Sequence, residues 1–195
     1  MTPDKNFDLD FIFKYLNSRT DIDGGWGLPT DALGSNVKSE EIYFGTQAHF
    51  NLFNSFLDQK LGVALNDISR EYNAYNSSYD GQILKFDWQS LLHLHKTNDL
   101  TLGVERKDEY AKTESMQEKE VGTTSVYLQD QISLFDAWFS TLGVRVDDNS
   151  RFGTEATYRF TTAYLIKQID MKLKGSYGTG FKAPSLIQLD RKSVV

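Results

Sequence analysis

The sequence contains no cysteine and only three prolines among its 195 residues. Without cysteine, disulfides, thiolate metal ligands and cysteine nucleophiles are all excluded. No stretch approaches the ~18 consecutive apolar residues of a transmembrane helix. The formal net charge is −6, so no basic excess favours a nucleic-acid partner. The first residues also lack the basic and apolar segments of a secretory signal, so we expect any export signal to be missing from this chain.

What the sequence does have is an alternation of apolar and polar residues with a period of two. Between residues 7 and 15, every odd position is Phe, Leu or Tyr, and the even positions are mostly polar. This pattern is typical of a strand with two different environments. Nine such segments follow one another, beginning near residues 7, 41, 57, 84, 100, 126, 138, 158 and 170. Each predicted strand has about 10–14 residues, enough for a tilted strand to cross a bilayer, whereas strands of soluble proteins average about 5–6.

The predicted connections alternate between short and long, as in outer-membrane barrels with short periplasmic turns and longer extracellular loops. Aromatic residues also gather beside the short turns, which is typical of an interfacial girdle. The short links fall near 54–55, 95–98, 135–137 and 166–168, the longer ones at 20–38, 73–81, 107–122 and 148–155, and the aromatics are Phe53, Phe56, Phe135, Trp138 and Tyr164. The sequence therefore predicts an oriented set of membrane strands.

The polar face of these strands carries Asp, Lys, Arg, Gln and His. Unpaired charges are costly to bury, so this face indicates a watery or plugged lumen rather than a dry core. Such a lumen belongs to barrels of about 16–22 strands. Nine strands would leave unpaired edges in lipid. We therefore predict an all-β fold: an antiparallel up-and-down transmembrane β-barrel, represented here by about nine of ~22 strands, with its plug absent.

Three stretches of the sequence resemble a known family, the TonB-dependent receptors of the outer membrane. SYGTGFKAPSL at 176–186, YLQDQ at 127–131 and GVRVDDNSRFG at 143–153 resemble motifs of that family, with Val146 in place of its usual aromatic residue. The resemblance covers most of 7–189 and is strongest to the vitamin B12 (cobalamin) receptors, with siderophore receptors close behind. Residues 190–195 depart from the family and back-translate to a common sequencing-adapter read. We therefore expect a partial receptor barrel at 1–189 and a non-native tail at 190–195.

The resemblance implies an active-transport receptor in the outer membrane of a Gram-negative bacterium, in contact with outer-membrane lipid. It would import cobalamin or a related corrinoid with energy supplied by the TonB complex through a plug that this chain lacks. A ferric siderophore is the alternative ligand. A soluble carbohydrate-binding β-sandwich is the alternative of another class. The sequence has no nucleophile elbow, so we do not expect an enzyme, and we expect no required cofactor.

Candidate ligand contacts fall in the predicted loops. Aromatic rings bury a large area at low entropic cost, and loop-tip cations can hold polar groups. The candidates are Trp26, Tyr75, Tyr79, Arg151, Phe152 and Lys182, the last of these expected near the lumen. Some cobalamin receptors bind calcium in acidic extracellular loops, so the resemblance also makes Asp21 and Asp23 weak calcium candidates. A solvated glycine-rich loop is the simpler interpretation of that segment.

Overall fold

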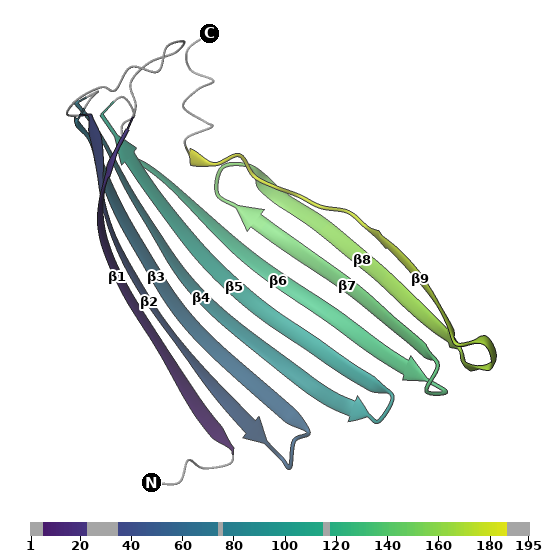
Figure 1. Ribbon diagram of the computed structural model, residues 1–195. Helices are drawn as coiled ribbons and strands as arrows, with labels where there is room; N and C mark the ends of the chain where they lie inside the picture. Colours follow the sequence, from purple (N-terminus) through teal and green to yellow (C-terminus); the bar gives the residue numbers. More distant parts are fainter. Residues whose placement is uncertain (1–5, 23–34, 74–75, 115–117, 187–195) are drawn as a thin grey trace.

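The computed structural model describes residues 6–22, 35–73, 76–114 and 118–186. They form one curved sheet of nine antiparallel strands in sequential order, which lie side by side in Figure 1. Within the described residues, each strand pairs with its sequence neighbours and there is no second layer. The strands are β1 Phe7–Asp21, β2 Asn36–Leu52, β3 Leu57–Tyr72, β4 Ser77–His95, β5 Asn98–Thr113, β6 Lys119–Leu134, β7 Trp138–Asn149, β8 Gly153–Ile166 and β9 Met171–Gly178.

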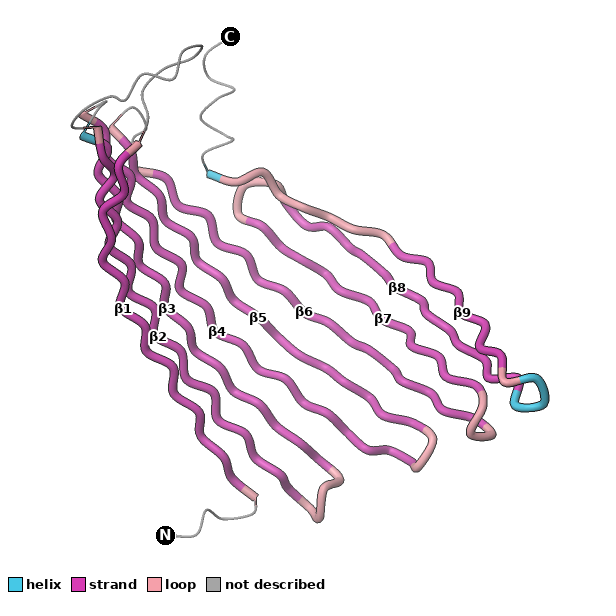
Figure 2. The backbone as a smooth tube through the Cα atoms, in the orientation of Figure 1, coloured by secondary structure: helices cyan, strands magenta, loops and turns pink. Residues whose placement is uncertain are grey.

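This arrangement confirms the predicted up-and-down antiparallel fold and all nine predicted strands. It does not match the β-sandwich alternative, which requires two sheets packed face to face. The described helical structure is limited to the short turn 167–169 and the single residues 73 and 186 (Figure 2). No helix in the described part of the chain is long and apolar enough to cross a membrane.

The outer face of the sheet, defined as the face that carries Phe11, is apolar over a limited height. On β1 it runs from Phe7 to Tyr15 and then turns polar at Asn17 and Arg19. Phe11 and Phe13 are 67% and 71% exposed, so no described part of the chain covers them. At about 3.4 Å per residue and a tilt of about 45°, the apolar stretch gives a band about 20 Å high, close to the ~25 Å band of membrane barrels.

The strand ends differ from the prediction on one side of the sheet. The links at 73–76, 114–118 and 150–152 are much shorter than predicted, because the strands continue past the apolar band. On β5 the outer face changes from Leu102 and Val104 to Arg106 and Asp108, yet pairing with β6 continues to Ala111. Backbone hydrogen bonding does not need an apolar face, so the alternation in side chains marked the band and not the whole strand.

Candidate functional site

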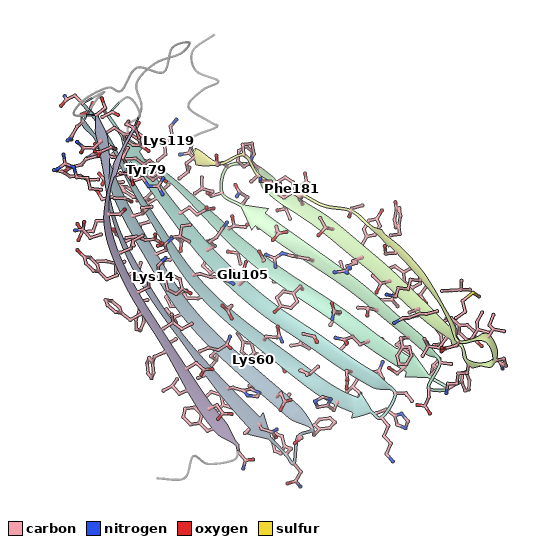
Figure 3. The ribbon with its side chains drawn as sticks, viewed as in Figure 1. Lys14, Lys60, Tyr79, Glu105, Lys119 and Phe181 are labelled. Carbon is pink, nitrogen blue, oxygen red and sulfur yellow. The ribbon has the colours of Figure 1, made fainter. Side chains whose placement is uncertain are left out.

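Charged side chains form a connected network on the inner face, opposite the apolar band. Lys85 of β4 lies with its Nζ 2.8 Å from Glu105 Oε2, and Arg145 of β7 donates from Nη2 to Glu105 Oε1 at 3.1 Å. Arg145 also donates from Nε to Asp147 at 2.8 Å. Glu105, labelled near the middle of the sheet in Figure 3, is therefore the carboxylate that joins two cations from different strands. Such a face is suited to water or polar groups rather than lipid.

Tyr127 lies beside this network, over a glycine of the neighbouring strand. Gly103 is paired directly with Tyr127 in the register between β5 and β6. A Cβ on Gly103 would lie 2.3 Å from the Tyr127 ring, so no larger residue fits without moving it. The Tyr127 hydroxyl donates to Gln89 at 3.1 Å, and the Arg145 guanidinium lies 5.9 Å from the ring centroid. The glycine thus lets an aromatic ring lie flat against the wall.

Residues 179–186, which we call the strap, leave β9 and cross the inner face of the sheet. At its start, Thr179 N–H donates to the Tyr158 carbonyl at 2.9 Å. At its end, Leu186 is 9% exposed and packs with Ala111, Val121 and Tyr79. These contacts connect the β8–β9 side of the sheet to β4, β5 and β6. Figure 2 shows this segment as a loop running along the end of the sheet. The strap therefore lies inside the curve of the wall.

A cavity of about 390 Å³ lies between the strap and the wall. The wall contributes carboxylates and cations, and the strap contributes Phe181 and Lys182. The charged and aromatic lining comprises Glu105, Lys107, Glu109, Arg145, Asp147, Phe181 and Lys182. A mixed lining of this kind can hold a polar small molecule through hydrogen bonds and one ring contact. Across the described ranges no three His, Asp or Glu side chains gather as a metal site.

Two predicted ligand contacts lie at or near this cavity. Lys182 lines it. Tyr79, expected at a loop tip, instead lies within β4 on the inner face, where it packs against the apolar cluster that holds Leu186. The strap thus brings Lys182 and Tyr79, which are far apart in sequence, to the same end of the inner face.

Arg151 and Phe152 lie together in the turn between β7 and β8. Both of their backbone N–H groups donate to the Asn149 side chain, at 3.0 and 3.2 Å. The Arg151 Nε donates to the Glu120 carbonyl at 3.1 Å, so this side chain is held against β6. Neither residue is among those lining the cavity under the strap.

The remaining candidates fall mostly outside the described residues. Trp26, Tyr75 and Asp23 lie there, and Asp21 ends β1, paired with Asn36. Sequence patterns alone did not single out Glu105, Arg145, Tyr127 or Leu186. The inward positions of Glu105, Arg145 and Tyr127 follow from the period of two, but their meeting depends on strand register. The position of Leu186 depends on the path of the strap.

Comparison with known proteins agrees with this geometry. The family model described as TonB dependent receptor-like, beta-barrel matches residues 2–192. The vitamin B12 transporter BtuB of Photobacterium profundum is 32% identical over 183 residues, covering 90% of this chain and 28% of that protein. This chain thus spans less than a third of that relative.

Solved structures of similar fold include a siderophore receptor and a peptide transporter. The siderophore receptor PirA from Pseudomonas aeruginosa matches with a TM-score of 0.80 at 17% identity, covering 95% of this chain and 32% of that one. The RagAB peptide transporter matches with a TM-score of 0.54 at 17% identity, covering 74% of this chain and 23% of that one. At these identities the matches show the fold alone.

The family comprises outer-membrane receptors and transporters, so the expectation that the chain is not an enzyme is confirmed. The apolar outer band, the charged inner face and the family match lead to one assignment. The chain belongs to the TonB-dependent receptors, and it forms nine consecutive strands of their β-barrel.

Proposed function

We propose that this chain is part of the wall of an outer-membrane receptor that imports cobalamin or a related corrinoid. The observation that supports a corrinoid as the ligand is the 32% identity to a vitamin B12 transporter over 90% of the chain. The mechanism has two steps: extracellular segments capture the ligand, and the ligand passes through the lumen when TonB acts on the plug. The plug and the TonB contact belong to parts of the receptor outside this chain.

The geometry of the wall supports passage of a polar solute along the inner face. Cations and carboxylates there neutralise each other, as in the group of Lys85, Arg145, Glu105 and Asp147, so a neutral or zwitterionic solute would meet little net field beside it. The apolar outer band supports contact with outer-membrane lipid. Exposed rings such as Phe11 and Phe13 are favourable in contact with lipid and unfavourable in contact with water. Both features agree with a location in the outer membrane of a Gram-negative bacterium.

Ligand contacts are proposed at the extracellular end. They are Lys182 and Tyr79 near the strap, Arg151 and Phe152 at the β7–β8 turn, and Trp26 and Tyr75 in the loops. Asp21 and Asp23 are proposed as a calcium site. Lys182 is the best placed, since it lines the cavity under the strap. Lys182→Gln in the full-length receptor should raise the half-saturating ligand concentration, and Lys14→Gln, on the inner face of β1 and outside that cavity, should not.

Uptake by the full-length receptor tests the proposal. The gene is expressed in a bacterium that lacks its own vitamin B12 receptor, and accumulation of radiolabelled cyanocobalamin is measured with and without functional TonB. We expect TonB-dependent accumulation well above an empty-vector control. Accumulation of a ferric siderophore instead of cyanocobalamin would contradict the corrinoid proposal and support the alternative ligand. If neither ligand accumulates, both ligand proposals are contradicted.

A further inference from the structure

Arg159 of β8 lies on the inner face between two glycines of the neighbouring strands. β8 is an interior strand of the sheet, and its register places Gly143 of β7 on one side of Arg159 and Gly178 of β9 on the other. Neither neighbour has a side chain that could pair with the guanidinium. A Cβ added to Gly143 would find its nearest heavy atom at 3.8 Å, so the wall is open there. Two glycines therefore flank a single arginine.

The guanidinium of Arg159 makes no hydrogen bond or ion pair with any side chain in the described part of the sheet. Its diagonal neighbour Arg145 is different, because it donates to Glu105, Ser125 and Asp147. The contrast concerns two arginines on the same face of adjacent strands. The charge of Arg145 is neutralised within the wall, and that of Arg159 is not.

Two hollows of about 460 and 410 Å³ meet at Arg159. The larger one extends toward the short turns and contains a second cation, Lys174, with no Asp or Glu in its lining. Polar groups that can donate surround the two cations: Gln131, Ser133, Thr141, Thr161 and Ser176. The lining of this hollow thus combines positive charge with neutral hydrogen-bond donors.

We infer that this hollow is an oxyanion-binding site on the lumen wall, with Arg159 as its main ligand contact. A guanidinium presents its N–H donors in a planar fork that matches a carboxylate or a phosphate group. Lys174 adds a point charge at the far end of the hollow, and the hydroxyl and amide groups satisfy the remaining oxygens. The site takes the phosphate or carboxylate of a small solute in the lumen.

The biological role of this site rests on the proposed transport function, but its test does not, because it measures binding without uptake. The full-length receptor in detergent micelles is treated with the arginine reagent phenylglyoxal, with and without inorganic phosphate, and labelling is quantified by peptide mass spectrometry. We expect Arg159 to react readily and inorganic phosphate to slow its labelling about tenfold. Arg19, on the outer face of β1 above the apolar band, is the control and should react at the same rate in both conditions.

A variant provides an independent measurement. Arg159→Gln should weaken calorimetric binding of inorganic phosphate about tenfold or more, and Arg19→Gln should leave it unchanged. If the Arg159→Gln receptor does not fold, the protection of Arg159 from phenylglyoxal in the wild-type receptor still tests the inference. An Arg159 that is unreactive before phosphate is added, as it would be if a carboxylate from another part of the receptor held it, would overturn the inference. Equal protection of Arg159 and Arg19 would overturn it as well.

Discussion

At the scale of single residues, the inner wall depends on where glycine allows another side chain to lie. Tyr127 covers Gly103, donates to Gln89 and lies within reach of the Arg145 guanidinium. The alternation of residues predicted that Tyr127 and Gly103 both face inward. It did not predict that they are direct partners, because that depends on the register between β5 and β6.

Gly103→Val should destabilise the receptor by about 1–3 kcal/mol, because a branched side chain must displace the Tyr127 ring. The measurement is the unfolding free energy of the full-length receptor in detergent, taken from urea titration. Gly143→Ala is the matched control, since its Cβ would meet only ordinary contacts at 3.8 Å or more, and it should change stability by less than about 0.5 kcal/mol. Equal effects of the two substitutions would contradict this account of Gly103.

Asp130 shows a second limit of sequence reasoning at this scale. It interrupts the apolar face of β6, and the pattern alone marks it as a charge on the wrong face. The structure keeps it on the outer face, where the Asn98 amide donates to it at 2.5 Å. A cross-strand partner from β5 therefore satisfies one oxygen of a carboxylate that the one-strand pattern leaves unexplained.

At the scale of elements, the strap is the segment that sequence reasoning placed least well. Glycine and proline, which it contains, are typical of a chain that bends at the end of a strand, and β9 ends at Gly178. Its return across the wall was not predictable, because that depends on the pocket formed by Ala111, Val121 and Tyr79 from three strands. Leu186 has no periodic partner in the sequence that would reveal its burial.

Leu186→Ala should release the strap. The loss of this buried side chain is expected to cost about 1–2 kcal/mol of local stability, and amide hydrogen exchange in 179–186 should quicken about tenfold. Phe181→Ala is the control, because Phe181 is 38% exposed and should contribute less. Exchange that is unaffected by Leu186→Ala would show that the strap is not held by this contact.

The ends of β5 and β6 beside the link at 114–118 lie beyond the apolar band and provide a pH prediction. The Tyr110 hydroxyl donates to Glu118 at 2.9 Å, and this bond, with the nearby charges of Glu118, Asp80 and Glu120, raises the pKa of Tyr110 above that of a free tyrosine. A raised pKa in the folded state contributes stability below the unfolded pKa of about 10, and the contribution is lost as the pH rises through the folded pKa. The link between these strand ends should therefore persist below about pH 10 and weaken above it.

Phenolate absorbance of the full-length receptor measures this titration, with the Tyr110→Phe variant subtracted to isolate one residue. We expect the midpoint of Tyr110 above about 10, and Glu118→Gln should move it back toward that value. A wild-type midpoint at or below the free value would contradict the hydrogen bond.

At the scale of the whole molecule, the period of two predicted the sheet and its two faces. It placed Phe11 and Phe13 outward and Lys14 inward, as the structure does. It failed at the extracellular ends, because a strand above the membrane is polar on both faces and has no alternation to detect. Candidate site residues were placed less well than strands, because strand register and the strap determine which residues meet. Lys182 lines the cavity, whereas Arg151 is held in a turn.

The central claim is that one face of this sheet meets lipid and the other a watery lumen. The chain contains no cysteine, so single cysteines for spin labels can be introduced along β6 without background from this segment. In the full-length receptor in bilayers, labels at Val126, Leu128 and Ile132 should collide mainly with oxygen, which concentrates in lipid. Labels at Tyr127, Gln129 and Gln131 should collide mainly with a water-soluble nickel chelate. The account predicts a strict alternation between these two sets, and equal accessibility at neighbouring positions would contradict it.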